Sequence, residues 1–508
     1  MPKNNKLLDL KGLKQIRKKF KKKKIILCHG VFDLLHVGHI NYFKAAKSFG
    51  DILVVSITDD KHVNKGPGRP AFSVLNRIKF LKEINCIDYV YASTFSTAEN
   101  VILNLKPHFY CKGSEYTVKQ IEFDQNLKKE ILALKSIKGK FKTIKQPSYS
   151  SSKFINDNDF QNLHSEAKNY IENIRKKYGL RRVQDSINKI ANKKVLIIGE
   201  TIIDKYITTE SIGKSGKEPM LVVKPKKEIN FLGGSAYIAN LCSSFVKRIK
   251  IISFLGKENT EKKFVLNNLN KKIKHKFFLK SKSPTIKKLR YVDYYRNTKI
   301  IGVYDLNDDP ISKVEEKIFY NAIKKDIKKY EVVIVADYGH GIITKKIREL
   351  ILKNGKKVFL NTQINSFNRG FHTVFNYKKI NTLIINESEL RYELRDKHSN
   401  IVNLVKKIRN NISAENIIVT RGKGGAVIIN SKSKQVLSCP AFNQSNKDTI
   451  GAGDTFFGLC SLALSSKIQP QISLFLSSIG ANFSIDQIGK KNIFDLSSLK
   501  KYIGHVLK

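Results

Sequence analysis

Short apolar runs alternate with helix-period segments along the first part of the chain. The runs KIILCHGV (24–31) and DILVVSITDD (51–60) are rich in β-branched residues, and the stretch between them closes at Gly50 with the apolar spacing of a helix. This order predicts a β-α-β unit with a parallel sheet. Further strands are predicted at 88–92 and 109–112, and further helices at 75–84 and 97–105.

Apolar runs return after residue 193. The first of them is VLIIG (195–199), and five more follow at 251–256, 332–339, 357–361, 382–386 and 416–422. Short, fully apolar strands separated by helices predict a second parallel sheet covered on both faces. Between them, 204–233 alternates apolar and polar residues, which predicts a small sheet set on the main body.

These patterns divide the chain into two α/β domains. Residues 1–156 form the first, and residues 193–508 form the second. The segment 157–192 has helical spacing and no proline, which predicts a helical linker between them. A length of 508 residues provides enough chain for a sizeable core in each domain.

Charge is the main anomaly of the composition. Lys and Arg number 94 against 43 Asp and Glu, giving a formal net charge of +51. Basic residues are spread along the whole length without an aromatic-interleaved cluster, which favours solvated faces over a nucleic-acid site. The six cysteines are scattered singly, so neither disulfides nor structural zinc are predicted. We expect a cytoplasmic protein, since the basic start lacks a signal-peptide core and no apolar run could span a membrane.

The string GVFDLLHVGH (30–39) lies where the first strand passes into the first helix. A helix N-terminus beyond a strand end offers backbone N–H groups to phosphate, and His36 and His39 share one helical face. An isolated pair with this spacing is usually two surface histidines. The neighbouring residues favour a phosphate site here, namely Gly30, Phe32, Asp33 and Gly38.

This string resembles the HxGH signature of the cytidylyltransferase-like nucleotidyltransferases. KGPGRP (65–70), KGSEY (112–116) and SYSSSKFI (148–155) follow in that family's order, and the first two look most like the heptose-1-phosphate adenylyltransferases. The resemblance implies a Rossmann-like domain in which His36 and His39 stabilise charge on the α-phosphate. It further implies nucleotide contacts at Gly30, Phe32, Asp33, Lys47, Lys112, Gly113, Ser150, Ser151 and Ser152.

A second string, KDTIGAGDTFFG (447–458), lies near the C-terminus. Gly451, Ala452 and Gly453 place small residues at a predicted helix N-terminus, where backbone N–H groups can surround a phosphoryl group. Asp454 follows at the start of that helix, where a carboxylate could accept a proton from a substrate hydroxyl. The alternative is an ordinary glycine-rich helix cap.

The string resembles the C-terminal signature of the ribokinase/PfkB sugar kinases. The resemblance implies a ribokinase-like α/β domain with a small β lid and Asp454 as the catalytic base. It implies substrate contacts at Asp204, Gly233, Gly234, Lys288 and Arg290. It implies nucleotide or phosphate contacts at Asn386, Glu389, Thr420, Gly422, Gly451, Ala452 and Gly453, with Glu389 acting on Mg²⁺ through water.

Three features depart from the pattern of heptose enzymes. Tyr237 stands where GGxxN usually has Asn, and a phenol there is expected to reshape the sugar pocket. LNTQINSFNRGF (360–371) replaces a DPK-like segment. The known bifunctional heptose enzymes also carry the kinase first, which is the reverse of this chain.

The leading hypothesis is a bifunctional sugar-activating enzyme. One domain would phosphorylate a sugar phosphate such as heptose 7-phosphate from ATP, and the other would join a sugar 1-phosphate to a nucleotide, giving an ADP-heptose-like product for lipopolysaccharide. The expected cofactors are Mg²⁺ and ATP, with CTP possible in the first domain. The expected partners are sugar phosphates, nucleoside triphosphates and a second copy of the chain, without nucleic acid or a membrane span.

Two alternatives remain open at this point. One keeps both domains but assigns a cytidylyltransferase for a polyol phosphate, fused to a carbohydrate kinase of other specificity. The other is a basic nucleic-acid-binding protein with degenerate enzyme domains. The exact sugar, the nucleotide base and the passage of intermediates between domains are not predicted.

Overall fold

The computed structural model describes residues 6–63, 70–113, 125–144, 163–296, 298–365, 367–431, 435–442, 451–484 and 495–507. The chain divides into two compact units, Met1–Asn162 and Leu163–Lys508. Both units are α/β with parallel sheets, which confirms the predicted fold class. None of the helices in the described ranges combines the length and apolar character that crossing a membrane requires.

The first unit has a six-stranded parallel sheet in the order β1-β4-β3-β2-β5-β6. Its elements are β1 Leu7–Leu8, α1 Leu10–Lys19, β2 Ile25–Gly30, α2 Val37–Lys47, β3 Ile52–Thr58, α3 Val74–Lys82, β4 Tyr89–Ser93, α4 Glu99–Leu105, β5 Phe109–Gly113, α6 Gln125–Ser136 and β6 Lys140–Ile144. The order reverses at β2, because β3 and β4 extend to one side of it and β5 and β6 to the other.

Helices cover both faces of this sheet, and each face has its own core. Phe43 and Ala46 of α2 and Leu81 of α3 pack on one face. Leu13 of α1, Ile102 of α4 and Leu134 of α6 pack on the other. The predicted strands and helices are present, but α1 was missed because its lysines obscured an amphipathic spacing that buries only Leu13 and Ile16.

The second unit is built on a nine-stranded sheet in the order β11-β10-β7-β14-β15-β16-β17-β18-β19. Its strands are β7 Lys194–Gly199, β10 Arg248–Glu258, β11 Lys274–Pro284, β14 Val332–Asp337, β15 Val358–Thr362, β16 Lys379–Asn386, β17 Ser413–Thr420, β18 Ala426–Asn430 and β19 Val436–Cys439. The pairs are parallel as far as β17, and β18 and β19 close one edge as antiparallel strands.

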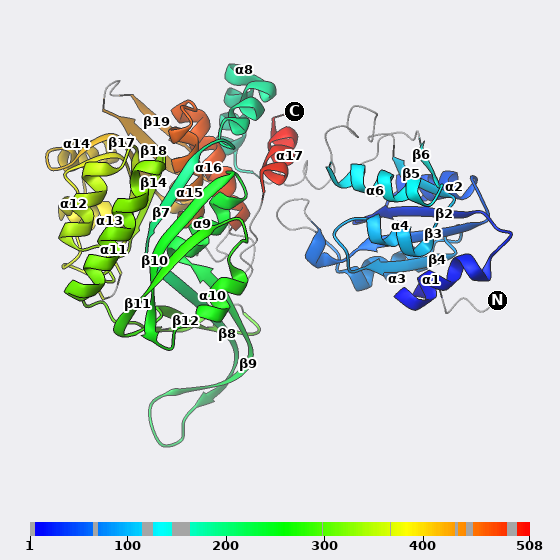
Figure 1. Cartoon of the computed structure of the whole chain (residues 1–508), viewed down its shortest axis with the longest axis horizontal. Helices are drawn as coiled ribbons and strands as arrows, with labels where there is room; N and C mark the ends of the chain where they lie inside the picture. Colours follow the sequence, from blue (N-terminus) through cyan, green and yellow to red (C-terminus); the bar gives the residue numbers. More distant parts are fainter. Residues whose placement is uncertain are drawn as a thin grey trace. The chain divides into compact units, whose positions relative to one another are not determined.

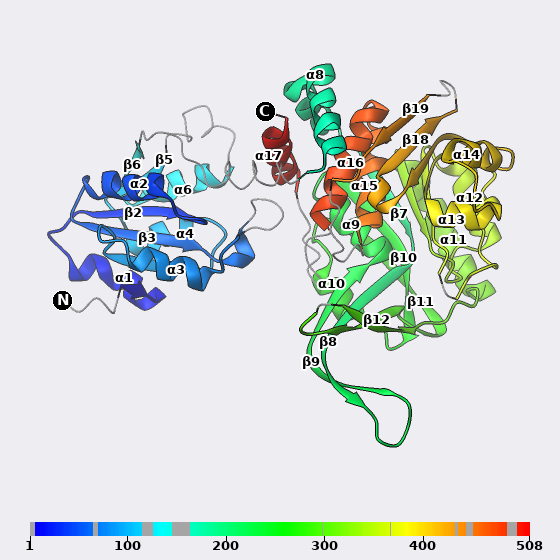
Figure 2. The same ribbon diagram turned by 180° about the vertical axis from the view of Figure 1, so that it is seen from behind.

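Two groups of helices sandwich this sheet, as Figures 1 and 2 show. One face carries α11 Lys313–Asp326, α12 Lys345–Asn354, α13 Glu387–Leu394 and α14 Ile401–Arg409. The other carries α9 Gly234–Ser243, α15 Ala452–Ser465 and α16 Pro470–Ser484. α8 Ser165–Asn188, α10 Lys262–Asn268 and α17 Leu496–Val506 complete the described helices of this unit.

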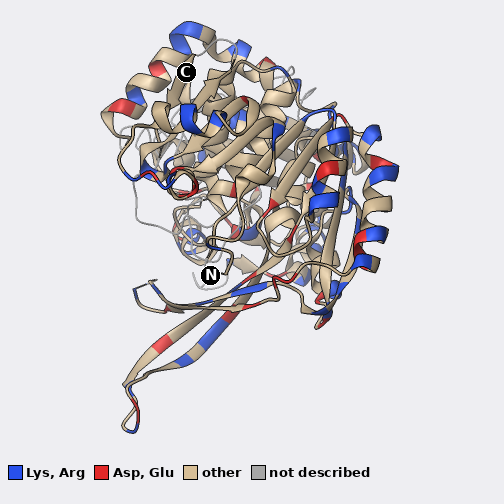
Figure 3. Cartoon of the chain, turned by 90° about the vertical axis from the view of Figure 1, so that its left-hand side faces the viewer, with Lys and Arg blue, Asp and Glu red and all other residues tan. Residues whose placement is uncertain are grey.

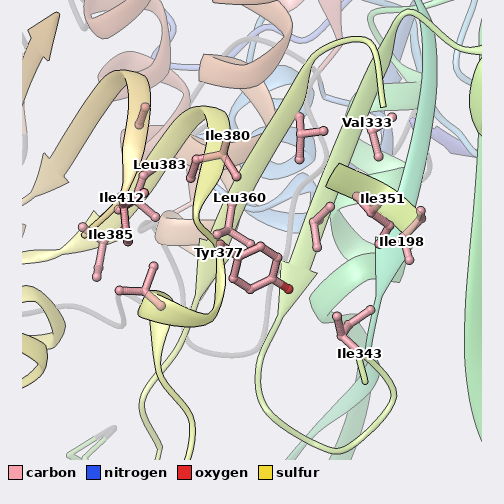
Figure 4. Packing of buried hydrophobic residues seen from close by; sticks show 14 of the residues in the cluster. Ile198, Val333, Ile343, Ile351, Leu360, Tyr377, Ile380, Leu383, Ile385 and Ile412 are labelled. Carbon is pink, nitrogen blue, oxygen red and sulfur yellow. The ribbon is translucent and has the colours of Figure 1, made fainter. Parts of the chain in front are cut away.

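The core beneath the first helical group is a single apolar cluster. Figure 4 shows Ile198, Val333 and Leu360 from three neighbouring strands packed with Ile351 of α12. Tyr377 lies in the same cluster, fully buried, with its hydroxyl donating to Asp337 Oδ2 at 2.6 Å. The continuous apolar runs of the sequence are therefore strands buried on both faces.

A separate four-stranded sheet, in the order β13-β12-β8-β9, forms the predicted lid. Its strands are β8 Thr201–Lys214, β9 Leu221–Gly233, β12 Lys287–Asp293 and β13 Lys299–Asp305. The alternation at 204–233 predicted β8 and β9, which pair as a long antiparallel hairpin. The sequence did not indicate that β12 would join β8 in parallel register.

The segment expected to link the domains forms helix α8, which is grouped with the second unit. It is two helices merged at Gly179, whose φ of 68° lies in the left-handed region that glycine tolerates. The Tyr170 ring packs against Phe442 and Phe475 of the same unit. The part of the predicted linker before residue 163 lies outside the described residues.

Candidate active sites

The first candidate site lies at the carboxyl edge of the first sheet, where the strand order reverses. In open parallel sheets, ligands bind in the crevice formed at such a reversal. Gly30 ends β2 and Gly113 ends β5, and these two strands are paired in register through Cys28 and Cys111. The topology therefore brings together the two stretches that the sequence analysis assigned to nucleotide binding.

His36 and His39 lie at the N-terminus of α2, with their ring centroids 4.0 Å apart. His36 is the N-cap, and its Nδ1 accepts from Gly38 N at 3.1 Å. His39 Nδ1 accepts from His36 N at 3.3 Å. Because a backbone N–H can only donate, each neutral ring must carry its proton on Nε2. The pair thus presents two Nε2–H donors at a helix N-terminus, and burial lowers the pKa of His36 below 6.5.

The turn between β2 and α2 is strained and tightly packed. Phe32 and Leu34 both have positive φ, at 47° and 46°, which is rare for residues other than glycine. A Cβ on Gly30 would lie 3.1 Å from the Phe32 ring, so glycine allows that ring to fold back. The packing around the turn holds it in this strained form, which leads into the His36 cap.

Asp33 and Arg77 hold this turn against the chain that follows β3. Asp33 accepts from Ala71 N at 2.7 Å and from Phe72 N at 3.0 Å. Arg77, only 1% exposed, donates to the carbonyls of Val31 and Thr58 and pairs with Asp60. Asp33 was predicted as a nucleotide contact, and both of these hydrogen bonds come from backbone groups. Sequence reasoning missed the clamp made by Arg77.

The remaining predicted residues of this site are placed differently. Lys112 is buried on β5, and its Nζ is 3.8 Å from Glu130 Oε2 of α6. Lys47 ends α2, about 15 Å along the helix from its start. It pairs with Asp88, just before β4, so the structure does not bring it to the carboxyl edge. Ser150, Ser151 and Ser152 lie outside the described residues.

The second candidate site lies at the carboxyl edge of the nine-stranded sheet, where α15 begins. Gly451 caps α15 with a φ of 86°, and Ala452 and Gly453 form its first turn. A Cβ on Gly453 would meet nothing within 4 Å. The helix N-terminus therefore faces open space among the described residues, as an anion site requires.

Asp454 projects from the first turn of α15 toward the residue that follows β14. Its Oδ1 accepts a hydrogen bond of 2.6 Å from the hydroxyl of Tyr338. Tyr338 is 1% exposed, and its pKa is raised well above 10 by burial and by the neighbouring Asp454 carboxylate. The phenol is therefore a permanent donor at neutral pH. The sequence analysis gave no sign of this contact.

The lid sheet supplies three charged side chains to this region. Asp204 of β8 is opposite Lys288 of β12 in the strand register, and Arg290 lies two residues further on the same face. Arg290 Nη1 donates to Asp204 Oδ1 at 2.8 Å. Lys288 is 8% exposed; burial lowers its pKa, while the charges of Asp204 and Asp454 oppose that shift. The cations of Lys288 and Arg290 thus lie in one cluster with the carboxylates of Asp204 and Asp454.

The paired glycines allow α9 to start against this cluster. A Cβ on Gly233 would lie 2.5 Å from Asp204 Oδ2. Gly234 has a φ of 54°, and a Cβ there would lie 2.4 Å from Glu200 O and 3.2 Å from the Tyr338 ring. At both glycines the backbone lies so close to neighbouring atoms that any larger side chain would clash.

The ends of β16 and β17 and the turns that follow them carry four of the predicted nucleotide or phosphate contacts, namely Asn386, Glu389, Thr420 and Gly422. Asn386 and Thr420 are register partners, and Gly422 begins the turn after β17. Asn386 and Glu389 form a capping box on α13, in which Glu389 Oε2 accepts from Asn386 N at 3.1 Å. Burial raises the pKa of Glu389 to about 7, and its charge acts on Tyr338.

Tyr237 does not line the site as the sequence analysis expected. It is 2% exposed, and its hydroxyl lies 2.8 Å from Thr455 Oγ1 and 3.4 Å from Ser484 Oγ. Helical periodicity explains the difference, because Tyr237 falls on the face of α9 that packs against α15. Tyr237, in place of the usual Asn, therefore alters the packing between α9 and α15.

The structure fits magnesium held mainly by phosphate and water. Among the described residues, His, Cys, Asp and Glu form no group of three or more that could hold a metal ion. Mg²⁺ usually keeps several waters and takes one or two carboxylates together with substrate phosphates. Glu389, half-buried beside the site, is the carboxylate that the resemblance implies for that ion.

Comparison with known proteins identifies both units. The model for pfkB family carbohydrate kinases matches residues 192–492, which is more than half of the chain. The chain belongs to this family. A second model, described as cytidylyltransferase-like, matches residues 27–157. The pfkB match covers the site around Asp454, and the cytidylyltransferase-like match covers the site around His36 and His39.

Several curated relatives are named Bifunctional protein HldE. The protein from Aliarcobacter butzleri is 25% identical over 307 residues, covering 58% of this chain and 61% of its own length. The one from Pseudomonas savastanoi pv. phaseolicola is 40% identical over 102 residues, covering 20% and 22%. The one from Helicobacter hepaticus is 33% identical over 137 residues, covering 27% and 28%. The match spans about three-fifths of the first relative and about a quarter of the others.

Solved structures of two sugar kinases also align with the chain. Ribokinase from Thermotoga maritima is 16% identical with a TM-score of 0.48, covering 61% of this chain and 99% of its own. Phosphofructokinase-2 from Escherichia coli is 14% identical with a TM-score of 0.49, covering 62% and 100%.

Proposed function

We propose that the protein is a bifunctional sugar-activating enzyme. Its second unit would phosphorylate a sugar phosphate from ATP, and its first unit would transfer a nucleotidyl group to a sugar 1-phosphate. Loss of the original phosphate from the bisphosphate that the kinase forms would be a separate step between the two. The observation that carries the proposal is that one chain holds both kinds of site, each at the carboxyl edge of its own parallel sheet. The two family matches support the same division.

The kinase step would use Asp454 as base. A sugar hydroxyl loses its proton to the carboxylate while its oxygen forms a bond to the γ-phosphorus of ATP, and the bond to the β-phosphate oxygen breaks to release ADP. Gly451, Ala452 and Gly453 would direct backbone N–H groups at the transferred phosphoryl group. Mg²⁺, when bound, neutralises charge on the phosphates.

The nucleotidyl step would need no covalent intermediate. An oxygen of the sugar 1-phosphate attacks the α-phosphorus of the nucleoside triphosphate, and pyrophosphate leaves. The Nε2–H donors of His36 and His39 would stabilise the charge that develops on the α-phosphoryl oxygens. No proton has to be removed from the attacking phosphate, so positioned donors meet the main requirement.

The kinase substrate we propose is a phosphorylated sugar such as heptose 7-phosphate, and the product we propose for the nucleotidyl step is an ADP-heptose-like nucleotide. Lys288 and Arg290 project beside Asp204, where cations could hold the phosphate of the sugar and a carboxylate could hold its hydroxyls. The chain's likeness to proteins named Bifunctional protein HldE supports this choice. Because both substrates are cytoplasmic metabolites, the proposal places the enzyme in the cytoplasm.

A substrate panel read by mass spectrometry tests the proposal. The purified chain is incubated with ATP and Mg²⁺ and either heptose 7-phosphate, a hexose phosphate or a polyol phosphate. In separate reactions it is given ATP or CTP together with a sugar 1-phosphate or a polyol phosphate. We expect one added phosphate on heptose 7-phosphate and an ADP-sugar from ATP. A product formed only from CTP and a polyol phosphate would support the cytidylyltransferase alternative instead.

Two matched variants separate the activities in that assay. Asp454→Asn keeps the shape of the side chain but accepts no proton, so we expect it to remove phosphorylation alone. His39→Ala should remove nucleotidyl transfer alone. If wild-type protein modifies none of the substrates, the proposed function is wrong.

A further inference from the structure

The contact between Tyr338 and Asp454 joins parts of the chain that lie 116 residues apart. The phenol donates to Oδ1 at 2.6 Å, and Tyr338 is almost completely buried. A short hydrogen bond from a buried donor fixes the rotamer of a carboxylate, because turning the carboxylate away would leave the phenol without its acceptor.

Side chains hydrogen-bond to both the backbone N–H and the backbone carbonyl of Tyr338. Glu200, 1% exposed, accepts from Tyr338 N at 2.9 Å and from His340 N at 3.2 Å. The Tyr338 carbonyl accepts from Asn365 Nδ2 at 3.0 Å and from Asn368 Nδ2 at 2.8 Å. The backbone of the residue therefore has little freedom to move.

The turn after Tyr338 requires glycine at position 339, because the backbone there lies close to the Asn368 side chain. Gly339 has a φ of 73°, and a Cβ there would lie 2.4 Å from Asn368 Nδ2. Asn365 and Asn368 belong to the segment 360–371, which differs from the DPK-like segment usual in heptose kinases. Segment 360–371 thus supplies the two side-chain amides that donate hydrogen bonds to the Tyr338 carbonyl.

We propose that Tyr338 is a positioning residue for Asp454, and that Glu200, Asn365 and Asn368 act through Tyr338 to keep it in place. The inference rests on the proposed kinase function, in which Asp454 accepts the substrate proton. A base must be held in the correct orientation toward the hydroxyl, and small displacements of such groups are costly to the rate. Tyr338 supplies that orientation without touching the reacting atoms.

The charged groups around this contact come from several elements. Lys288 of β12 lies close enough to Asp454 for their charges to interact, and Glu200 and Glu389 act on the Tyr338 phenol. Removing the phenol leaves Lys288 in place but deprives the carboxylate of a donor. A carboxylate with fewer donors holds its proton more tightly, so the acidic limb of the kinase pH profile should move to higher pH.

The test is Tyr338→Phe, compared with Tyr377→Phe as a matched control. Each substitution removes a buried phenol that donates to an aspartate at 2.6 Å, but Tyr377 donates to Asp337 within the apolar core (Figure 4). We expect Tyr338→Phe to lower kcat about 10- to 100-fold, with the KM for ATP changed less than about twofold. Tyr377→Phe should keep kcat within about twofold, although it also lowers the denaturation midpoint.

A double-mutant cycle with Asp454→Ala separates positioning from general stability. If Tyr338 acts through Asp454, adding Tyr338→Phe to Asp454→Ala changes residual turnover less than about twofold. The two substitutions should also be non-additive in the denaturation midpoint, which requires no substrate.

The outcomes are distinct. Wild-type kcat in Tyr338→Phe, an equal loss in Tyr377→Phe, or an additive midpoint would each overturn the positioning role while leaving the kinase proposal intact. A wild-type protein that phosphorylates no sugar overturns the proposed function, and a non-additive midpoint would then assign the Tyr338–Asp454 contact to stability alone.

Discussion

At the scale of single residues, both histidines of the first site accept hydrogen bonds from backbone N–H groups. His36 Nδ1 accepts from Gly38 N, and His39 Nδ1 accepts from His36 N. The same bonds that begin α2 therefore select the ring tautomer with Nε2–H. Helix capping uses the Nδ1 side of each ring, and the proposed phosphate recognition would use the Nε2 side.

We expect His36→Ala and His39→Ala each to lower nucleotidyl transfer by ~10²–10³, because each removes one donor from the developing charge. Kinase turnover should stay near wild type, since Asp454 lies in the other unit. Pyrophosphate release and sugar phosphorylation, measured on the same preparations, check both statements. His108→Ala is the matched control, since His108 Nδ1 accepts from Ile25 N at the opposite edge of the sheet. Equal losses in all three variants would indicate a structural effect.

Local spacing predicted which residues lie side by side where they fall within one turn of chain. His36 and His39 are one example and the Gly451–Asp454 string is another, and the roles assigned to them stay predictions. The structure does not bring Lys47, predicted as a nucleotide contact, to the histidines, because it lies almost three turns along α2 from them. Tyr338 and Arg77 were missed because their partners are distant in sequence or are backbone carbonyls, which leave no pattern in side-chain types.

At the scale of elements, both sites depend on how a helix begins. Gly451 adopts a φ of 86° as the cap of α15, and a Cβ on Gly453 in the first turn would meet no atom of the described residues within 4 Å. The first glycine serves backbone conformation, and the second keeps clear the space in front of the helix N-terminus. The two positions should therefore respond differently to the same substitution.

We expect Gly451→Ala to lower stability by about 1–2 kcal/mol, because an L-residue is strained in the left-handed region. Gly453→Ala should leave stability unchanged or raise it, since alanine favours a helix. Its methyl group would nevertheless enter the proposed phosphate position, so the KM for ATP should rise severalfold. Thermal unfolding and steady-state kinetics distinguish the two variants. Identical effects would argue against this division of roles.

Element boundaries show where sequence patterns stop being informative. The apolar runs predicted every strand from β14 to β17, because these strands are buried on both faces and need little context. β12 is partly buried and β13 mostly exposed, and only their pairing, β12 with β8 and β13 with β12, reveals them as part of the lid. The break at Gly179 likewise follows from one residue's backbone conformation.

At the scale of the whole molecule, basic and acidic residues occur side by side in the parts of the chain that Figure 3 turns toward the viewer. Figure 3 shows Lys and Arg interspersed with Asp and Glu along the helices and the long hairpin that face the viewer. Ion pairs such as Lys205–Glu228 and Lys226–Glu210 occur along that hairpin. This distribution is typical of solvated surface residues.

We expect acid to destabilise both units through buried histidines. Burial lowers the pKa of His29 in the first unit and of His340 in the second to about 3, whereas an unfolded histidine titrates near ~6.5. The unfolded state binds more protons between these values. The free energy of unfolding therefore falls as pH drops from ~6.5 toward 3, by at most ~1.4 kcal/mol per pH unit for each histidine.

Denaturant midpoints at pH 7, 6 and 5 check this expectation. His29→Asn and His340→Asn should each flatten the dependence below pH 6.5, because neither asparagine takes up a proton. Unchanged slopes in both variants would show that other groups dominate acid unfolding.

The division into two units also predicts where the chain can be cut. Ile171, Ile174, Val183 and Ile187 of α8 are buried. Tyr170 and Tyr178 of the same helix hydrogen-bond to Gln471 of the second unit. A fragment beginning at residue 163 keeps these contacts, whereas one beginning at residue 193 loses them and should unfold at a lower temperature.

The most direct test of two independent activities in one chain is to assay fragments 1–162 and 163–508 separately with the substrate panel. The account predicts that 1–162 joins a sugar 1-phosphate to the nucleotide without phosphorylating any sugar, and that 163–508 phosphorylates the sugar phosphate without releasing pyrophosphate. If both fragments fold but either one lacks its assigned half-reaction while the full chain performs both, the assignment of one activity to each unit is wrong.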